Sequence, residues 1–298
     1  MGELRFRTGR SLDLALTLGP LAHGPRDPST RVRPGEFRRA TRTPVGPASL
    51  RLRQDRGELV AEAWGPGADW VLEHVPVLAG ALDDDRDFDP GDGLVGELHH
   101  RFPGLRICRS LAMFETLVPT ILEQKVPSVQ AYSAYAGVVR LFGEPAPGPL
   151  GLQLPPGPEV LAALPYWRLH QFDIERKRAD TIRRAAVSAA RLEEAVTMPL
   201  ERARARLTAL PGVGDWSAAE VTMRALGDAD AVSVGDYHLP NLVSWALAGE
   251  ARGTDQRMLE LLEPFRGHRG RVLRLLAAAV RRAPSFGPRT ALRSFGRE

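Results

Sequence analysis

Residues 202–226, RARARLTALPGVGDWSAAEVTMRAL, join two segments of helical periodicity through the short turn LPGVG at 210–214. A turn of this length between two helices predicts a tight hairpin. We expect Gly212 and Gly214 to adopt positive φ angles and to let the backbone approach another surface, with Asp215 as the cap of the second helix. The first amides of that helix would then point outward and could bind a phosphate. A lone Gly-x-Gly is more often an ordinary glycine-capped turn, but the apolar flanks make this motif more specific.

The rest of the chain predicts an α+β protein with two domains. Residues 37–64 contain runs such as SLRLRQ and ELVAEAW, in which apolar and polar residues alternate as in antiparallel strands. The acidic stretch DDDRDFDPGDG at 83–93 is typical of a linker. Helical periodicity follows it. We therefore expect a small N-terminal α/β domain with an antiparallel sheet at 1–100, and an all-α helix-hairpin-helix domain at 101–298.

Short loops rich in glycine and proline separate the helices expected in the second domain. These helices cover residues 110–126, 128–142, 158–164, 173–191, 199–207, 215–226, 237–248, 256–263 and 267–281. Pro119 is expected to kink the first of them.

Basic residues are concentrated in the second part of the chain. Residues 104–298 hold 26 Lys and Arg against 20 acidic residues, and residues 266–298 hold nine Arg and one acid, Glu298. Such a C-terminal end could bind a polyanion, or it could be a solvated basic tail. No apolar stretch is long enough to span a membrane and no leader pattern is visible, so we expect a cytoplasmic protein.

Cysteine and histidine usage argues against metal cofactors. A single cysteine, Cys108, is too few for an internal disulfide or for a cluster held by several thiolates, such as an iron–sulfur cluster. The histidines of the first hundred residues lack partner ligands at the spacing of a metal site, so we expect no transition metal.

Four segments are similar to those of a known family: FETLVPTILEQKV at 114–126, ERKRADTIRRAA at 175–186, LPGVGDWSA at 210–218 and SVGDYHLPN at 233–241. Over most of its length the chain resembles the helix-hairpin-helix (HhH-GPD) DNA glycosylases, and among them the 3-methyladenine DNA glycosylase II (AlkA-like) branch. The resemblance implies a monofunctional enzyme that hydrolyses the N-glycosidic bond of damaged, mainly alkylated, purines in base excision repair. It also implies a monomer that associates with the nucleoid and binds double-stranded DNA containing damaged bases.

The resemblance makes Asp236 the expected catalytic residue. In this family an aspartate follows the hairpin by about two dozen residues, and Asp236 lies 22 residues after Gly214. Cleavage of the N-glycosidic bond builds positive charge on the deoxyribose, which a carboxylate beside C1′ stabilises while it orients the attacking water. Alternatively, Asp236 is only the N-cap of the helix that follows. The hairpin before it favours catalysis.

Aromatic side chains are expected around the damaged base. Trp216, Tyr237 and Phe265 stand where the family has residues that stack on an electron-poor base, although each could instead belong to a core. Relatives that also nick the strand carry a lysine at the position of Trp216. Since the only lysines are Lys125 and Lys177, we expect no lyase activity.

The expected DNA contacts come from the hairpin and from the end of the helix at 110–126. They are Gly212, Val213, Gly214, Asp215, Gln124 and Lys125. In the family the position of Lys125 is often an apolar wedge that fills the gap left by the flipped base. The lysine could fill this gap with its stem and reach a phosphate, could indicate another way of opening DNA, or could simply extend into solvent from a helix end.

Two further expectations concern ligands and function. The family's hairpin can hold a monovalent cation, Na⁺ or K⁺, through backbone carbonyls, which makes Thr208, Leu210 and Val213 the candidate ligands. No other cofactor is expected. The alternative to an enzyme is a non-catalytic or divergent helix-hairpin-helix DNA-binding protein, an option that Lys125 supports and Asp236 opposes.

Overall fold

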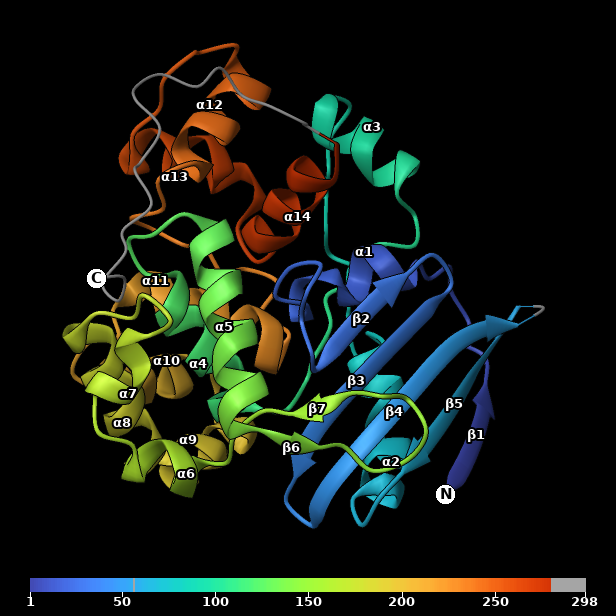
Figure 1. Ribbon diagram of the computed structural model, residues 1–298. Helices are drawn as coiled ribbons and strands as arrows, with labels where there is room; N and C mark the ends of the chain where they lie inside the picture. The colour runs from blue at the N-terminus through green and yellow to red at the C-terminus, as the bar shows by residue number, and fades with distance from the viewer. Residues whose placement is uncertain (56, 280–298) are drawn as a thin grey trace.

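A five-stranded antiparallel sheet forms the first part of the structure, a computed structural model that describes residues 1–55 and 57–279 (Figure 1). In spatial order the strands are β1 (Gly2–Phe6), β5 (Glu58–Trp64), β4 (Gly46–Asp55), β3 (Glu36–Thr43) and β2 (Thr30–Arg33). Two helices, α1 (Leu14–Leu18) and α2 (Ala68–Leu78), share a hydrophobic core with this sheet, and the 3₁₀ turn η1 (Gly19–Leu21) follows α1.

Alternation along β4 decides which face of the sheet is buried. Leu50 and Leu52 are at most 1% exposed and lie in the core that α1 and α2 share with the sheet. Arg51 lies on the opposite face, because successive side chains of a strand alternate. There its guanidinium is 2.5 Å from Glu62, its cross-strand partner on β5. The antiparallel strands and the α+β class predicted from the sequence are confirmed.

The second part of the structure is a helical bundle around α4 (Met113–Glu123), in which nine of the eleven residues are buried. Its neighbours are α5 (Ser128–Phe142), α8 (Arg176–Val187), α9 (Ala189–Glu193) and α11 (Asp215–Val221). The remaining elements are α6 (Pro158–Ala163), α7 (Trp167–His170), η2 (Glu194–Thr197), α10 (Leu200–Thr208) and the π-helix η3 (Thr222–Leu226).

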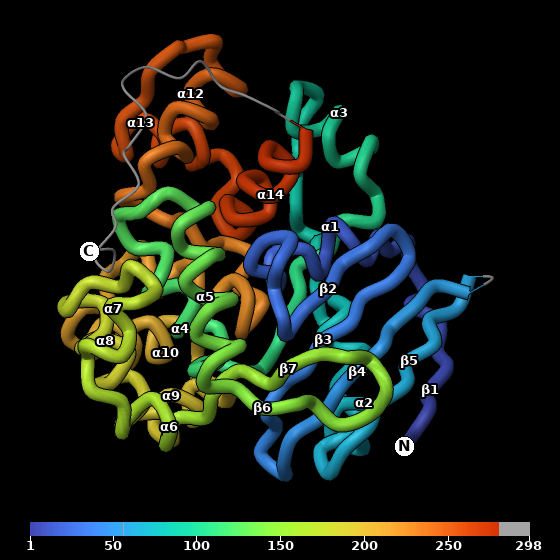
Figure 2. The backbone as a smooth tube through the Cα atoms, in the orientation of Figure 1, coloured from blue at the N-terminus to red at the C-terminus, as the bar shows by residue number. Residues whose placement is uncertain are grey.

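A third group of helices joins segments that are far apart in the sequence. It contains α3 (Leu94–Arg101), α12 (Leu239–Ala248), α13 (Asp255–Leu262), η4 (Glu263–Phe265) and α14 (Arg269–Ala279). The path of the chain in Figure 2 shows α3 beside α14, although α3 precedes most of the helical residues in sequence. Among the helices of residues 1–55 and 57–279, none has the length and apolar composition needed to span a lipid bilayer.

The described residues of the region predicted to be entirely helical include a β-hairpin. Its strands are β6 (Glu144–Pro145) and β7 (Gln153–Leu154). The hairpin lies against the sheet of the first part: Gln153 N donates to Pro28 O at 2.9 Å, and Leu152 packs in a small core with Ala40 of β3. A segment rich in proline and glycine therefore ties the helical bundle to the sheet, and the expectation of helices alone is wrong here.

The acidic stretch at 83–93 forms no helix or strand, and Asp84, Asp87, Asp89 and Asp92 are exposed, but Asp83 and Asp85 pack against distant segments. Asp83 accepts two hydrogen bonds from Arg271, at 2.6 and 2.9 Å, and both side chains are at most 2% exposed. Asp85 pairs with Arg106 at 3.0 Å. A buried guanidinium requires such a partner, because an unpaired charge away from water is costly. The stretch connects α2 to α3, and two of its carboxylates also pair with arginines that come later in the chain.

Four of the nine arginines of residues 266–298 bind partners within the protein. Arg266 pairs with Glu263, Arg269 with Asp230 and Arg271 with Asp83, while Arg274 donates to the carbonyl of Leu16. These four arginines are thus engaged within the protein. The other five arginines of residues 266–298 lie outside the described residues.

Candidate active site

The hairpin between α10 and α11 is held in shape by its backbone and by α8. Val213 N donates to Leu210 O at 3.0 Å and closes the turn. Gly212 has a φ of +100°, and a Cβ added there would lie 2.2 Å from Thr181 Oγ1 on α8. Both the backbone conformation and this close approach require glycine. The predicted positive φ and close approach of Gly212 are therefore confirmed, and its contact with DNA stays a prediction.

The second glycine and the cap differ from expectation. Gly214 has a φ of −108° and a ψ of −173°, which is extended backbone open to any residue, and a Cβ there would have free space. Gly214 itself occupies the N-cap position of α11, without a capping side chain, and Asp215 is the first helical residue. The expectations of a positive φ at Gly214 and of a cap at Asp215 are wrong. Asp215 still places negative charge at the positive end of the helix dipole.

Trp216 and Asp236 are brought together across 20 residues of sequence. The indole Nε1 of Trp216 donates to Asp236 Oδ2 at 3.0 Å. The other oxygen, Oδ1, accepts the amides of His238 at 2.7 Å and Leu239 at 2.9 Å, and so caps the start of α12. Three N–H donors fix the orientation of this partly exposed carboxylate. Asp236 thus caps the first amides of α12 as the alternative predicted, although the N-cap position itself is His238, and Oδ2 stays turned toward Trp216.

The other two aromatic candidates have different surroundings. Tyr237, next to Asp236, is 69% exposed, and its ring lies 4.9 Å from that of His238 in an edge-to-face arrangement. Phe265 packs against the core of α3, α12, α13 and α14, with its ring 6.4 Å from Phe88. The surroundings of Phe265 are those of a core residue, the alternative that the sequence left open. Trp245 on α12, 41% exposed, is an aromatic residue that the sequence analysis did not single out.

Gln124 fastens the hairpin to the end of α4. Its Nε2 donates to Gly212 O at 3.0 Å and lies 2.9 Å from Ser217 Oγ of α11. The next residue, Lys125, is exposed and has a φ of +55°, a conformation that is uncommon outside glycine. Residues whose backbone is held in such conformations occur preferentially at functional sites. The structure thus gives Gln124 a structural contact and leaves Lys125 in solvent beside the hairpin.

A partly buried ion-pair network connects α11 to the loop that carries Asp236. Arg224 Nη2 lies 2.5 Å from Glu220 Oε2. The second oxygen of Glu220 accepts the hydroxyl of Ser233 at 2.5 Å, and the carbonyl of Ser233 accepts the amide of Asp236 at 3.2 Å. The network therefore fixes the backbone that leads into Asp236. The i,i+4 spacing of Glu220 and Arg224 is a local pattern that favours their pairing in a helix, whereas the bond from Ser233 to Glu220 depends on the fold.

The same network reaches the end of α4. Arg224 Nη1 lies 3.6 Å from Glu123 Oε2, and His23 Nδ1 lies 3.6 Å from the other oxygen. Burial acts to lower the pKa of Arg224, but the carboxylates of Glu220 and Glu123 outweigh it and raise that pKa. Burial likewise acts to raise the pKa of Glu123, but Arg224 and His23 lower it. Both side chains therefore stay charged at neutral pH.

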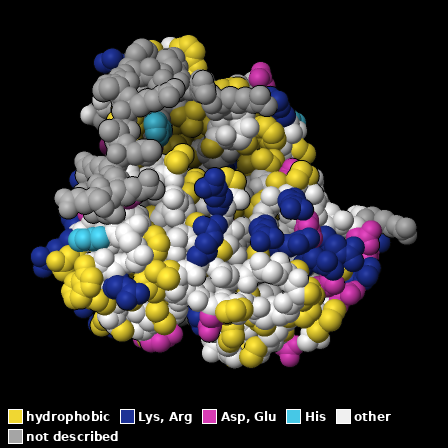
Figure 3. Space-filling model, viewed as in Figure 1, with side chains coloured by type: hydrophobic (Ala, Val, Ile, Leu, Met, Phe, Trp, Pro, Cys, Tyr) yellow, Lys and Arg dark blue, Asp and Glu magenta, His cyan; other side chains and the backbone are white. Residues whose placement is uncertain are grey.

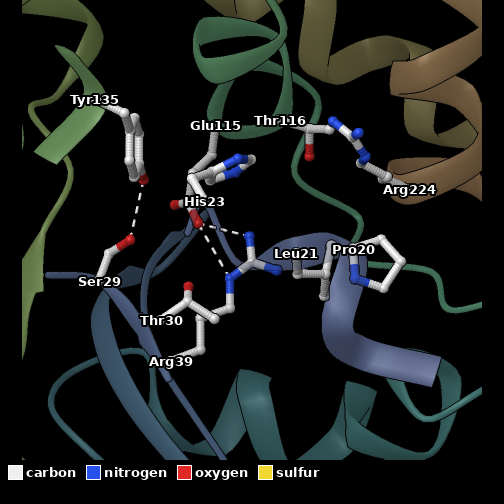
Figure 4. Close-up of a pocket in the computed structure, with 10 residues that line it drawn as sticks. All are labelled: Pro20, Leu21, His23, Ser29, Thr30, Arg39, Glu115, Thr116, Tyr135 and Arg224. Carbon is white, nitrogen blue, oxygen red and sulfur yellow. Dashed lines mark hydrogen bonds and ion pairs between the residues drawn. The ribbon is translucent and has the colours of Figure 1, made fainter. Parts of the chain in front are cut away.

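A polar cavity beside this network is too small to hold a base. Figure 4 shows its lining, in which Arg39 pairs with Glu115 at 2.6 Å and Ser29 shares a hydrogen bond with Tyr135 at 3.0 Å. Its volume is about 10 Å³, room for one water molecule. The cavity lies between the sheet and the helical bundle, and the side chains that line it connect these two parts. The surface is hollowed elsewhere, between the lobe of α12 and α14 and the rest of the molecule, with Lys and Arg side chains nearby (Figure 3).

Two curated relatives share part of this sequence, although no family model matches the chain. The probable bifunctional transcriptional activator/DNA repair enzyme AlkA of Mycobacterium tuberculosis is 35% identical over 144 residues, which cover 46% of this chain and 28% of that protein. The DNA-3-methyladenine glycosylase 2 of Escherichia coli is 28% identical over 179 residues, 59% of this chain and 62% of that protein. The chain thus spans less than two thirds of the length of these relatives.

Solved structures share the fold over nearly the whole chain. The 3-methyladenine DNA glycosylase from Archaeoglobus fulgidus has a TM-score of 0.77 and 22% identity, and covers 92% of this chain and 97% of its own. The 8-oxoguanine glycosylase/lyase from Clostridium acetobutylicum has a TM-score of 0.68 and 13% identity, with coverages of 93% and 96%. The chain therefore has the fold of the helix-hairpin-helix DNA glycosylases, and part of its sequence is similar to the curated AlkA and DNA-3-methyladenine glycosylase 2 proteins.

Proposed function

We propose that the chain is a monofunctional DNA glycosylase that hydrolyses the N-glycosidic bond of damaged, alkylated purines in double-stranded DNA. The observation that carries this proposal is the contact between Trp216 Nε1 and Asp236 Oδ2, 3.0 Å long, directly behind the hairpin. The names of the relatives, which refer to DNA repair and to 3-methyladenine, support the choice of substrate class. We further propose that the protein acts as a monomer.

In the proposed reaction Asp236 stabilises positive charge on the sugar. The bond between C1′ and the base nitrogen breaks, its electron pair leaves with the base, and water adds to C1′ while it loses a proton. A fixed carboxylate beside C1′ favours the cationic transition state without having to reorient. The amides at Oδ1 and the indole at Oδ2 provide this fixed orientation. The rings of Trp216 and Tyr237 would stack on the flipped base.

The hairpin would bind the DNA backbone. Its exposed glycines let a phosphate approach the amides that start α11, where Val213, Gly214 and Asp215 lie. The carbonyls of Thr208, Leu210 and Val213 suit a monovalent cation, because the last carbonyls of a helix have no partner within it and α10 ends here. Leu210 O accepts only one hydrogen bond in the described structure, so its second lone pair is available. Such a cation would add positive charge toward the phosphate.

A hydrolytic and not a lyase mechanism is proposed because of Trp216. The fold alone does not decide between them, since the Clostridium acetobutylicum structure of similar fold is described as a glycosylase/lyase. A Schiff base needs an amine at C1′, and Trp216 offers none. The lysines, Lys125 and Lys177, lie at other places around the hairpin.

The test is a panel of duplexes that each carry one lesion, 3-methyladenine, 7-methylguanine or a deaminated purine. Wild-type protein is incubated with each duplex, and free base and strand breaks are measured with and without alkali. The proposal expects base release from at least one alkylated purine, with strand breaks only after alkali. Binding without base release on every duplex would instead favour a non-catalytic DNA-binding protein, in which Asp236 serves only as the cap of α12.

A further inference from the structure

Both lysines of this arginine-rich protein lie beside the hairpin. Lys125 follows Gln124, whose side chain donates to Gly212 O. Lys177 is on α8, and its carbonyl accepts the hydroxyl of Thr181, the side chain against which Gly212 packs. The two lysines therefore stand near the hairpin on different segments, Lys125 in the turn after α4 and Lys177 on α8.

A third cation completes the group. Arg184 is exposed on α8, and its Nη1 lies 3.4 Å from the carbonyl of Pro211 in the hairpin. Lys177, Thr181 and Arg184 are spaced by four and three residues, so they form one stripe along α8. Since α8 rises about 1.5 Å per residue, the two cations start roughly 10 Å apart and can contact different phosphates of one strand.

The neighbouring stripe of α8 is neutralised, in contrast to the one that faces the hairpin. Arg176 and Arg183 lie 3.6 and 3.7 Å from the carboxylate of Asp180, which lies between them. Among the described residues no carboxylate lies within 4.0 Å of Lys125, Lys177 or Arg184. On α8, the cations without a carboxylate partner thus lie on the side of the hairpin, as expected of a surface that binds an anion.

We propose that Lys177 and Arg184, together with Lys125, clamp the phosphates of the DNA strand on either side of the hairpin. The clamp reads no sequence, because its groups contact the backbone only. Its role is to fix the duplex on α8 so that the hairpin and Asp236 meet the same nucleotide. This inference rests on the proposed function and adds α8 to the DNA-binding surface.

The test measures the salt dependence of binding by fluorescence anisotropy with an undamaged duplex. Lys177→Gln and Arg184→Gln are compared with wild type, and Arg183→Gln on the same helix is the matched control. Loss of one phosphate contact lowers the slope of log Kd against log salt by about 0.9, and weakens binding roughly tenfold at 0.1 M salt. We expect this change for each of the two variants, about twice the change in slope for the double variant, and little change for Arg183→Gln.

Unchanged slopes for both Lys177→Gln and Arg184→Gln would overturn the clamp, and so would an equal effect of Arg183→Gln, which would indicate only net charge. Lys177→Arg should restore the slope. Equal melting temperatures of all variants establish that the fold is retained, as expected for exposed side chains. A wild-type protein that binds no duplex would refute the proposed function itself, whereas normal wild-type binding with unaffected variants would refute only the clamp.

Discussion

The hydrogen bond from Trp216 to Asp236 can be removed with little change in shape. Trp216→Phe keeps an aromatic ring on α11 and deletes the Nε1 donor, which lies 3.0 Å from Oδ2. A hydrogen bond to a charged group contributes about 1.5–3 kcal/mol. The lower end applies here, because Asp236 is partly exposed and the amides of His238 and Leu239 still hold Oδ1. A loss of about 1.5 kcal/mol in the transition state corresponds to a roughly tenfold slower reaction.

The assay is base release under single-turnover conditions with enzyme in excess, on the lesion that wild type excises best. We expect Trp216→Phe to lower the maximal rate about tenfold and to change the Kd for the duplex much less. Trp216→Ala, which also removes the ring, should weaken binding of the lesion in addition. An unchanged maximal rate for Trp216→Phe would refute the reasoning that this bond orients the carboxylate.

Three further predictions concern the hairpin, the buried ion pair and the mechanism. Gly212→Ala should lower the free energy of unfolding by about 1–3 kcal/mol, because the added Cβ strains the positive φ and collides with Thr181. Gly214→Ala is the control and should melt like wild type; equal melting temperatures of the two variants would contradict this reasoning. Asp83→Ala should lower the free energy of unfolding, measured in urea, by about 3–5 kcal/mol, because Arg271 loses its buried partner. Asp84→Ala is the control and should change it little, because the pair of Asp84 with Arg86 is exposed. Borohydride should trap no covalent adduct on a lesion-bearing duplex; a strong trapped band that Lys125→Ala abolishes would overturn hydrolysis as the mechanism.

Local patterns were sufficient for much of the fold. The alternation in SLRLRQ predicts β4 and its buried face, because a strand exposes every second side chain. The apolar periodicity between Pro127 and Gly143 predicts the observed bounds of α5. Gly212 could also be predicted, since a short helical hairpin needs a residue that tolerates positive φ.

What failed depends on contacts between distant segments. The acidic stretch at 83–93 has the sequence of a linker, and its pairing with Arg106 and Arg271 is not visible there because both partners come later in the chain. The i,i+4 spacing of Glu220 and Arg224 is visible in the sequence, but nothing there shows that Glu220 also accepts the hydroxyl of Ser233 in the loop before Asp236. Local reasoning can identify residue types that suit a site, but it cannot show which charges meet in the folded protein.

The measurement that tests the central claim most directly is the single-turnover rate of base release by Asp236→Asn, beside its Kd for the same duplex. Asparagine can still accept the amides of His238 and Leu239 through its carbonyl oxygen, so the cap of α12 is retained. Loss of the charge should slow base release by about a hundredfold or more and leave the Kd nearly unchanged. If Asp236→Asn releases the base as fast as wild type, Asp236 is the cap of a helix and not the catalytic residue.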